Sequence, residues 1–482
     1  MSATPWEMVV GLEVHVQLKT ETKAFCACSA EFGAAPNHNT CPVCLGLPGA
    51  LPVLNDQAVE LAIRAALAIG CTVHERSVFA RKNYFYPDLP KGYQISQFDR
   101  PIATLGALDI LAGDRPKRVG ITRLHMEEDA GKSVHDRFQG ATAIDLNRAS
   151  VPLVEIVSEP DMRSSAEAGA YLRALKQVLE YAGISDCSME LGSLRVDANV
   201  SARPAGSTEL RSRTEIKNVN SFSNVERALD LEFARHVATY EAGGTIVQQT
   251  MLFDGARGEV RPARSKEGSH DYRYFPEPDL PPLVIAPERI ERVRKALPEF
   301  PAAKVARYQA ALGLTSVEAG VVAASAHLAR YFETLLVKGA AAKAAANWVT
   351  GACMQALNER SLDPVALEQL VPVDALARIL ALVQAGTISS SAAKSVFAAV
   401  LADPATSPDA VVAAQGLVQV SDDGALDRWI DEVLVEHPAE AARFVAGERK
   451  LQGVLIGFVM KKSKGSADPK KLAQLLGARA TG

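Results

Sequence analysis

Glu13 and His15 are two ionisable residues in a stretch that alternates between apolar and polar side chains. In residues 9–18, apolar side chains at positions 12, 14, 16 and 18 alternate with Glu13, His15 and Gln17. This two-residue period predicts a strand with one buried face and one polar face. The carboxylate and the imidazole then lie about 7 Å apart on the same face. They could hold a cation or a phosphate if further acids converge on them; a solvated sheet face is the alternative for the pair alone.

A second candidate segment follows His125. Glu127, Glu128 and Asp129 are three consecutive carboxylates there. Divalent metal ions with a hard charge prefer oxygen donors of this kind. The sequence therefore predicts that these acids are metal ligands, and a solvated acidic turn is the alternative for this segment alone.

Glu155 interrupts an apolar run at residues 152–157. The run has the character of a buried strand, where an unpaired carboxylate would be costly. Glu155 therefore needs a metal or a basic partner. An ion pair with Arg148 is the purely structural alternative.

Two later segments, residues 194–201 and 215–221, repeat the pattern of a strand with a polar face. They add Asp197 and Glu215 to the acids. Convergence of so many ionisable groups predicts a catalytic, metal-assisted site. Its candidate members are Glu13, His15, Glu127, Glu128, Glu155, Asp197 and Glu215.

Four of the seven cysteines form two close pairs, Cys26 with Cys28 and Cys41 with Cys44. This spacing predicts a tetrahedral four-thiolate zinc site, with buried or redox-active cysteines as the alternative. Four thiolates leave no open coordination position, so the zinc is expected to be structural. The odd total argues against a disulfide framework, and neither a signal peptide nor an apolar run of about 18 residues is visible, so we expect a cytoplasmic protein.

Residues 81–97 interleave aromatic side chains with Arg81, Lys82 and Lys91. This composition predicts a shaped loop in which aromatic rings stack on a base or ribose and the cations meet phosphates. An aromatic corner of the core is the alternative. Residues 264–282 mix cations and aromatics in the same way and end in a proline-rich linker.

The arrangement of the patterns predicts an α+β chain. Amphipathic helices are expected at residues 55–70, with Asn55 as the N-cap, and at 164–182, with Ser164 or Ser165 as the N-cap, between the strand-like segments. After about residue 290 the chain becomes alanine-rich and helical, with a hinge near residues 404–408. Helices are expected there at about 287–297, 301–312, 316–336, 339–358, 365–384, 389–402, 422–436 and 438–460.

The last forty residues are basic although the whole chain has a formal net charge of −4. From Arg443 onward there are nine lysines and arginines against two acids. A local excess of this kind is what contact with a phosphate backbone requires, and a solvated tail is the alternative. The lysines concerned are Lys461, Lys462, Lys464, Lys470 and Lys471.

Seven motifs together resemble the B subunit (GatB) of the Asp/Glu-tRNA(Asn/Gln) amidotransferases, and the resemblance runs essentially from end to end. They lie at residues 11–15, 81–97, 124–132, 145–161, 192–195, 217–218 and 271–278. The resemblance implies an N-terminal, mostly antiparallel-sheet cradle domain with flanking helices (residues 1–290). An all-α helical domain (291–405) and an all-α tail domain (406–482) would follow.

The resemblance also implies a division of labour among partners in a heterotrimer. In that family, the A subunit releases ammonia from glutamine, and the C subunit is a small strap around it. The B subunit binds the misacylated tRNA and uses ATP to phosphorylate the side-chain carboxylate of Glu-tRNA(Gln) or Asp-tRNA(Asn). Ammonia that has travelled through a channel then displaces the phosphate. A tRNA-binding scaffold with structural acids is the alternative function.

Residue by residue, the resemblance implies a magnesium site made by Glu13, His15, Glu128 and Glu155. Lys91 and Glu128 match positions of a polar gate at the channel mouth, which makes Glu128, Lys91, Glu13 and His15 the expected catalytic residues. Tyr84, Lys91, Asp197, Glu215 and Lys217 are expected to contact ATP. The four cysteines match a zinc knuckle found in some members, and the basic tail matches a tRNA-binding domain. Residues 249–251 depart from the family pattern, so no role is expected there.

Overall fold

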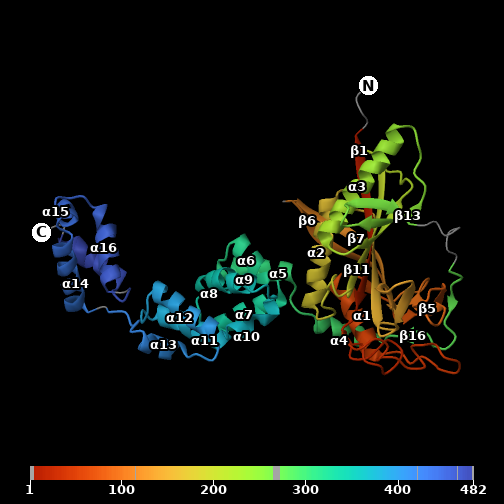
Figure 1. Ribbon diagram of the computed structural model, residues 1–482, viewed down its shortest axis with the longest axis horizontal. Coiled ribbons are helices and arrows are strands. Elements are labelled where there is room, and N and C mark those ends of the chain that lie inside the picture. The colour runs from red at the N-terminus through yellow and green to blue at the C-terminus, as the bar shows by residue number, and fades with distance from the viewer. Residues whose placement is uncertain (1–4, 114, 264–271, 421, 464, 480–482) are drawn as a thin grey trace. The chain divides into compact units, whose positions relative to one another are not determined.

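The computed structural model describes residues 5–113, 115–263, 272–420, 422–463 and 465–479 (Figure 1). The chain divides into two compact units, residues 1–300 and 301–482. The first unit contains a large sheet with helices, and the second is helical, as the sequence predicted.

A nine-stranded sheet organises the first unit, in the order β14-β13-β12-β11-β1-β10-β7-β6-β2. All neighbouring strands pair antiparallel except β12 and β13, which are parallel. The predicted mostly antiparallel sheet is therefore confirmed. Its strands are β1 (Trp6–Gln17), β2 (Thr72–Val73), β6 (Ala103–Ala112), β7 (Arg115–Glu128), β10 (Pro152–Ser158), β11 (Leu194–Pro204), β12 (Thr214–Val219), β13 (Gln249–Asp254) and β14 (Glu259–Pro262).

Three helices pack on the apolar face of this sheet: α1 (Asp56–Ala68), α2 (Ser165–Tyr181) and α3 (Phe222–Glu241). Their apolar side chains share one core with Leu12 and Val14 of β1. The predicted N-caps are present, because the Asn55 side chain accepts hydrogen bonds from two backbone N–H groups of α1 and Ser164 caps α2. The opposite face of the central strands is left for polar side chains.

Small sheets border the large one. A three-stranded sheet has the order β15-β4-β5, and β16 pairs with β3 and β8 with β9. The backbone N–H of Ile95 in β5 donates to the side chain of Glu128, which places the three-stranded sheet against the end of β7. The strands are β3 (Arg76–Ser77), β4 (Phe79–Asn83), β5 (Tyr93–Gln97), β8 (Lys132–Phe138), β9 (Ala141–Asp145), β15 (Phe275–Pro276) and β16 (Leu283–Val284).

Helix α4 (Pro287–Lys295) ends the first unit, and the second unit has two hydrophobic cores. The first core contains α5 (Pro301–Leu312), α6 (Ser316–Ala323), α7 (Ala326–Val337), α8 (Ala342–Trp348), a π-helical turn (Val349–Cys353), α9 (Met354–Glu359), a 3-10 turn (Pro364–Ala366), α10 (Leu367–Leu370), α11 (Val373–Gln384), α12 (Ser390–Ala402) and α13 (Pro408–Ala414). The second contains α14 (Asp423–Glu436), α15 (Pro438–Val445), α16 (Leu451–Lys462) and α17 (Pro469–Arg479).

Three of the longer predicted helices are each divided. Residues 365–384 form the 3-10 turn, α10 and α11, and α11 begins anew after Pro372. Residues 316–336 form α6 and α7, because the Ser325 side chain caps a new helix at His327. Residues 438–460 form α15 and α16, separated by Gly447 with a φ of 106° that an L-residue rarely adopts. Helices α13 and α17 were not predicted. Within the described part of the chain, we find no helix with the length and apolar character needed to cross a membrane.

Candidate active site

The register of three central strands aligns ionisable residues in a row. His15 of β1 lies opposite Glu155 of β10, and Glu155 lies opposite His125 of β7. Directly opposed residues point to the same side of a sheet, and Glu127 shares that side with His125 because it is two positions away. These four residues, His15, His125, Glu127 and Glu155, are called the sheet-face group below.

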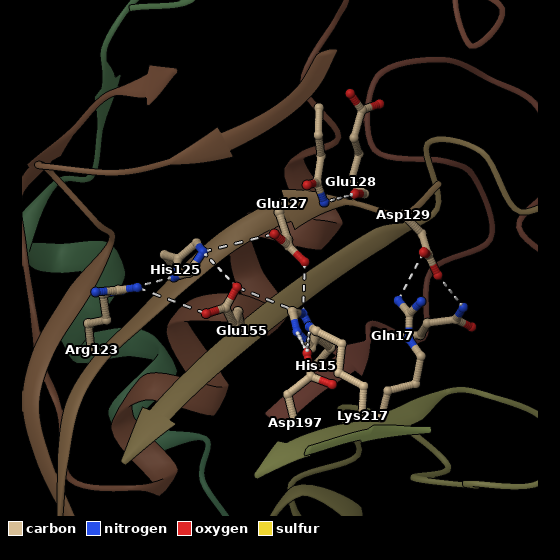
Figure 2. A network of polar contacts seen from close by, with 12 residues as sticks. His15, Gln17, Arg123, His125, Glu127, Glu128, Asp129, Glu155, Asp197 and Lys217 are labelled. Atoms are coloured by element: carbon tan, nitrogen blue, oxygen red, sulfur yellow. Dashed lines mark hydrogen bonds and ion pairs between the residues drawn. The ribbon is translucent and has the colours of Figure 1, made fainter. Parts of the chain in front are cut away.

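The side chains of the sheet-face group converge (Figure 2). His15 Nδ1 lies 3.0 Å from Glu127 Oε1 and 3.8 Å from Glu155 Oε2. His125 Nε2 lies 3.4 Å from Glu155 Oε2 and 4.0 Å from Glu127 Oε2. His15, Glu127 and Glu155 each offer one possible ligand atom, and these three atoms lie within 4.8 Å of one another. Such a group could hold a metal ion.

Further polar side chains surround the group. Arg123 Nη2 lies 3.9 Å from Glu155 Oε1, and Asp197 Oδ2 lies 3.9 Å from His15 Nε2. On the neighbouring strand β12, Lys217 Nζ binds Asp197 at 2.6 Å (Figure 2). It also binds Glu215 at 3.1 Å.

Burial and mutual proximity shift the protonation of these groups. Burial lowers the pKa of His15, but the carboxylates of Glu127, Glu155 and Asp197 outweigh it and raise the pKa to about 9. Burial raises the pKa of Glu155, but His125 and His15 lower it below its usual range. Burial and the carboxylates of Glu155, Glu215 and Asp197 raise the pKa of Glu13. Negative charge is thus crowded around a histidine that can exchange its proton for a metal ion.

Glu13 has only a neutral partner in the described part of the chain. The Asn199 side chain donates a hydrogen bond of 3.0 Å to Glu13 Oε1, and no ion pair reaches Glu13 among the described residues. The structure places Glu13 opposite Asp197, on the same face as the sheet-face group. It is therefore available as a further ligand.

Glu128 lies in a different place from the rest of the predicted magnesium site. Because successive side chains of a strand alternate, Glu127 and Glu128 point in different directions (Figure 2). Glu128 forms a buried ion pair with Lys91 and accepts hydrogen bonds from Ser150 Oγ and the Ile95 N–H. We therefore revise the predicted metal group, with Glu127 in place of Glu128.

The contacts of Asp129 and the burial of residues 127–129 exclude two structural alternatives, the Arg148–Glu155 ion pair and the solvated acidic turn. The Asp129 carboxylate binds Arg195 at 2.9 Å and lies 3.5 Å from Arg148 Nε. Arg148 is therefore occupied by Asp129, and the predicted structural ion pair between Arg148 and Glu155 is wrong. The solvated acidic turn is also wrong, since Glu127, Glu128 and Asp129 are only 4, 1 and 3 % exposed.

The segment 81–97, expected to be a shaped loop, consists of paired strands β4 and β5 joined by a loop. Strand β4 supplies a cation, Lys82, beside the sheet-face group. Lys82 Nζ lies 4.9 Å from the ring centre of Tyr272 and 6.0 Å from that of Tyr84. Burial lowers the pKa of Lys82, but Glu127, Tyr274 and Glu155 raise it above its usual value. Neither a hydrogen bond nor an ion pair to Lys82 Nζ occurs among the described residues. The sequence predicted that Lys82 meets phosphates, but it did not predict that Lys82 lies beside the sheet-face group.

The tip of this loop is exposed. Phe85 is 86 % and Tyr86 50 % exposed, so these two rings do not form the alternative core corner. The Tyr84 hydroxyl donates to Gln94 Oε1 at 3.4 Å. Of the second cation-rich and aromatic segment, residues 264–271 lie outside the described residues.

The four clustered cysteines meet as predicted. One sulfur each of Cys26, Cys28, Cys41 and Cys44 lies within 4.8 Å of the others, which is compatible with a structural zinc ion. None of these residues is in a disulfide. The hydrogen bond from Cys26 lowers the pKa of Cys44 to about 4, so this sulfur readily becomes a thiolate ligand.

The basic tail is less positive than its sequence implies. Lys462 pairs with Glu432 and Glu436, and Lys471 pairs with Asp423, all on α14. Lys461 and Lys470 are exposed, and no ion pair reaches either of them among the described residues. Lys464 lies outside the described residues. Acids that are distant in sequence therefore neutralise part of the predicted phosphate-binding surface.

Comparisons with known proteins agree with this architecture. A family model described as the GatB/GatE catalytic domain matches residues 8–291, and one described as the GatB domain matches residues 330–479. The chain belongs to the GatB/GatE family. The match to the catalytic domain includes every residue of the sheet-face group, and the second match includes all of α14–α17.

Members of the GatB/GatE family are similar to this chain over nearly its whole length. A protein of Geobacter sulfurreducens, named as the B subunit of the aspartyl/glutamyl-tRNA(Asn/Gln) amidotransferase, is 53% identical over 98% of each chain. Proteins of the same name from Syntrophotalea carbinolica (99% of each chain) and Chlorobaculum tepidum (98%) are 51% and 50% identical. Family membership makes this chain an amidotransferase subunit of the ligase class.

Proposed function

We propose that this chain is the tRNA-binding and carboxylate-activating subunit of a tRNA-dependent amidotransferase. It would use ATP to activate the side-chain carboxylate of Glu-tRNA(Gln), Asp-tRNA(Asn) or both, and then direct ammonia onto the activated group. The observation that carries the proposal is the sheet-face group, in which His125, Glu127 and Glu155 are buried and His15 is half-buried, in a chain whose relatives are named as the amidotransferase B subunit. A scaffold would not need carboxylates on otherwise apolar strands, because they cost stability there.

The reaction needs an activated carboxylate because a carboxylate oxygen is a poor leaving group. A side-chain oxygen of the aminoacyl group attacks the γ-phosphorus of ATP, and ADP leaves. Ammonia then attacks the acyl carbon and the C–O bond to phosphate breaks. The amide is released together with inorganic phosphate, which carries away the proton that ammonia loses. The protein must therefore hold a polyphosphate and an anionic side chain close together.

The sheet-face group is suited to hold magnesium beside the phosphates. His15, Glu127 and Glu155 supply an imidazole and two carboxylates, with Glu13 as a further oxygen donor. His125 and Arg123 lie next to Glu155 and orient its carboxylate. When bound, magnesium would offset the negative charge that develops during phosphoryl transfer.

The residues expected at the nucleotide fall into two classes. Lys217 is held by Asp197 and Glu215, so these three would shape the site rather than offer a free charge. Lys82 is a cation between two aromatic rings without a carboxylate partner among the described residues, so we assign it to the phosphoryl group, with Tyr84 beside it.

The buried ion pair between Lys91 and Glu128 is the proposed gate for ammonia. Its burial favours the role, because ammonia must be shielded from water and protonation before it reaches the acyl phosphate. Ammonia would come from a glutaminase partner, the A subunit, with the C subunit as the third chain of the heterotrimer. The tail would bind the tRNA, chiefly through Lys461 and Lys470.

The experiment compares ATP hydrolysis by the complete heterotrimer in the presence of Glu-tRNA(Gln) or Asp-tRNA(Asn). Glu127→Gln should abolish the tRNA-stimulated hydrolysis, while Glu226→Gln, a change in an ion pair on the surface of α3, should leave it intact. Unchanged hydrolysis by Glu127→Gln in a normally assembled complex would instead establish the scaffold function.

A further inference from the structure

Residues 24–46 carry the four cysteines and are called the cysteine segment below. Both members of the Lys91–Glu128 ion pair lie next to this segment. The segment lies on one side of the Lys91 stem, under its ammonium group and against the residue that holds Glu128. We propose that the four-cysteine metal site is a positioning device for Lys91, so that metal occupancy sets the geometry of this ion pair.

The first contact is with the Lys91 stem. Gly46 follows Cys44 by two residues and has a φ of 67°. A Cβ on Gly46 would overlap Lys91 Cγ and would lie 3.1 Å from Lys91 Cβ and 3.2 Å from its Cα. The backbone of the second cysteine pair therefore packs directly on Lys91.

The second contact is with the ammonium group. Phe25 directly precedes Cys26 and is buried. Lys91 Nζ lies 5.8 Å from the centre of the Phe25 ring and 5.5 Å from that of Tyr93. The first cysteine pair thus places an aromatic face beside the cation.

The third contact leads to Glu128. The backbone N–H of Ala24 donates to the carbonyl of Ser150 at 2.8 Å, and the Ser150 hydroxyl donates to Glu128. Ser150 has a φ of 66°, an uncommon conformation for a side-chain-bearing residue that this packing must hold. One segment, closed on itself by four sulfurs, therefore borders both ends of the ion pair.

Metal binding would hold this segment because the two cysteine pairs are separated by twelve residues with little regular structure. Without the metal, Gly46 and Phe25 are no longer held in place by a cross-link between the two cysteine pairs. Their contacts with Lys91 then loosen, and the Lys91 amine becomes more accessible. The consequence for ammonia transfer rests on the proposed function, whereas the accessibility of Lys91 does not.

The test is competitive amine labelling of the full chain in its complex, read by mass spectrometry, with Lys117 as the internal reference. Lys117 pairs with Glu167 on α2 and is remote in sequence from the cysteines. Removal of zinc with a chelator, or the change Cys44→Ser, should raise the labelling of Lys91 severalfold and leave Lys117 unchanged. Unchanged Lys91 labelling, or an equal rise at both lysines, would overturn the proposal.

The change Gly46→Ala tests whether Lys91 can be displaced while zinc stays bound. Gly49→Ala is its matched control. Both glycines have positive φ, but nothing lies within 4 Å of a Cβ on Gly49. We expect Gly46→Ala to retain zinc and to raise Lys91 labelling, while Gly49→Ala retains zinc and matches the parent. Equal labelling in the two variants would contradict the inference even if the proposed amidotransferase activity is confirmed.

Discussion

Two buried groups of glutamate and histidine occur in the first unit, and they differ in the kind of partner that neutralises the carboxylate. In the sheet-face group, the imidazole of His15 pairs with Glu127 and that of His125 pairs with Glu155. In the other group, on α3, Glu232 is also buried with a histidine, His236. The comparison shows which buried charges are available for chemistry.

In the α3 group, the carboxylate of Glu232 is surrounded by fixed partners. Glu232 binds Arg235 at 2.6 Å, Thr214 Oγ1 at 2.8 Å and His236 Nε2 at 3.2 Å. Burial raises the pKa of Glu232, but the hydrogen bonds from His236, Arg235 and Thr214 outweigh it and lower the pKa to about 2. A guanidinium does not release its proton in a protein, so no metal can replace it here.

The sheet-face group has replaceable partners. An imidazole can exchange its proton for a metal ion, and Glu13 nearby has no cationic partner among the described residues. We therefore assign catalysis to the sheet-face group and structure to the α3 group. Five predictions test this distinction and extend it, in order of decreasing effect.

The largest effect is expected for Glu155→Gln. Loss of one charged ligand should weaken Mg²⁺ or Mn²⁺ binding and lower tRNA-stimulated ATP turnover about a hundredfold. It should also lower the free energy of unfolding measured without metal, because His125 and His15 hold the pKa of Glu155 below its usual range. Metal titration and turnover assays measure this. Parent-like metal affinity in the variant would remove Glu155 from the metal site.

The complementary change is Glu232→Gln. It should lower the free energy of unfolding by about 3 kcal/mol, because Arg235 and His236 lose a buried partner, while turnover per folded molecule stays at the parent value. Denaturant unfolding and activity assays separate these effects. A loss of turnover in folded Glu232→Gln protein would break the distinction between the two groups.

The pH dependence of stability follows from the same group. The pKa of Glu232 is lowered to about 2 in the folded protein. The contribution of the Glu232 charge to the free energy of unfolding is therefore fully present above pH 4.5 and is lost as the pH falls through about 2. Acid unfolding of the parent should therefore be steeper in this range than that of Glu232→Gln. Parallel curves for the two proteins would contradict the assignment.

Lys82 extends the comparison to a cation without a carboxylate partner among the described residues. Lys82→Met should lower the kcat of ATP hydrolysis about tenfold and leave the KM for aminoacyl-tRNA unchanged, and Lys82→Arg should recover part of the loss. Lys117→Met, which breaks an ion pair with Glu167, is the control. Equal kinetics of Lys82→Met and the control would exclude Lys82 from the phosphoryl site.

The smallest effect is expected in the tail, where paired and unpaired lysines lie close in sequence. Changing Lys461 and Lys470 together to alanine should weaken tRNA binding severalfold and reduce the slope of log affinity against log salt by about two. The same change at Lys462 and Lys471, which pair with acids of α14, should do less. Equal effects of both pairs would mean that tRNA displaces those acids.

Much of the fold could be predicted from the sequence because its signals are local. Strand β1 is defined by a two-residue alternation, and α1 and α2 begin at the expected caps Asn55 and Ser164. The spacing of the four cysteines alone predicted that they cluster. Divided helices were missed where one residue, such as Gly447, ends a helix inside an otherwise continuous pattern.

The sequence by itself determined which residues could do chemistry: the ionisable side chains on apolar strands and the four thiols. Only the tertiary structure decided which of them meet. Glu127 and Glu128 are neighbours in sequence, yet strand alternation sends one toward His15 and the other toward Lys91. Cross-strand register and the pairing of α14 with the tail lysines join distant segments, and no local pattern specifies such long-range contacts.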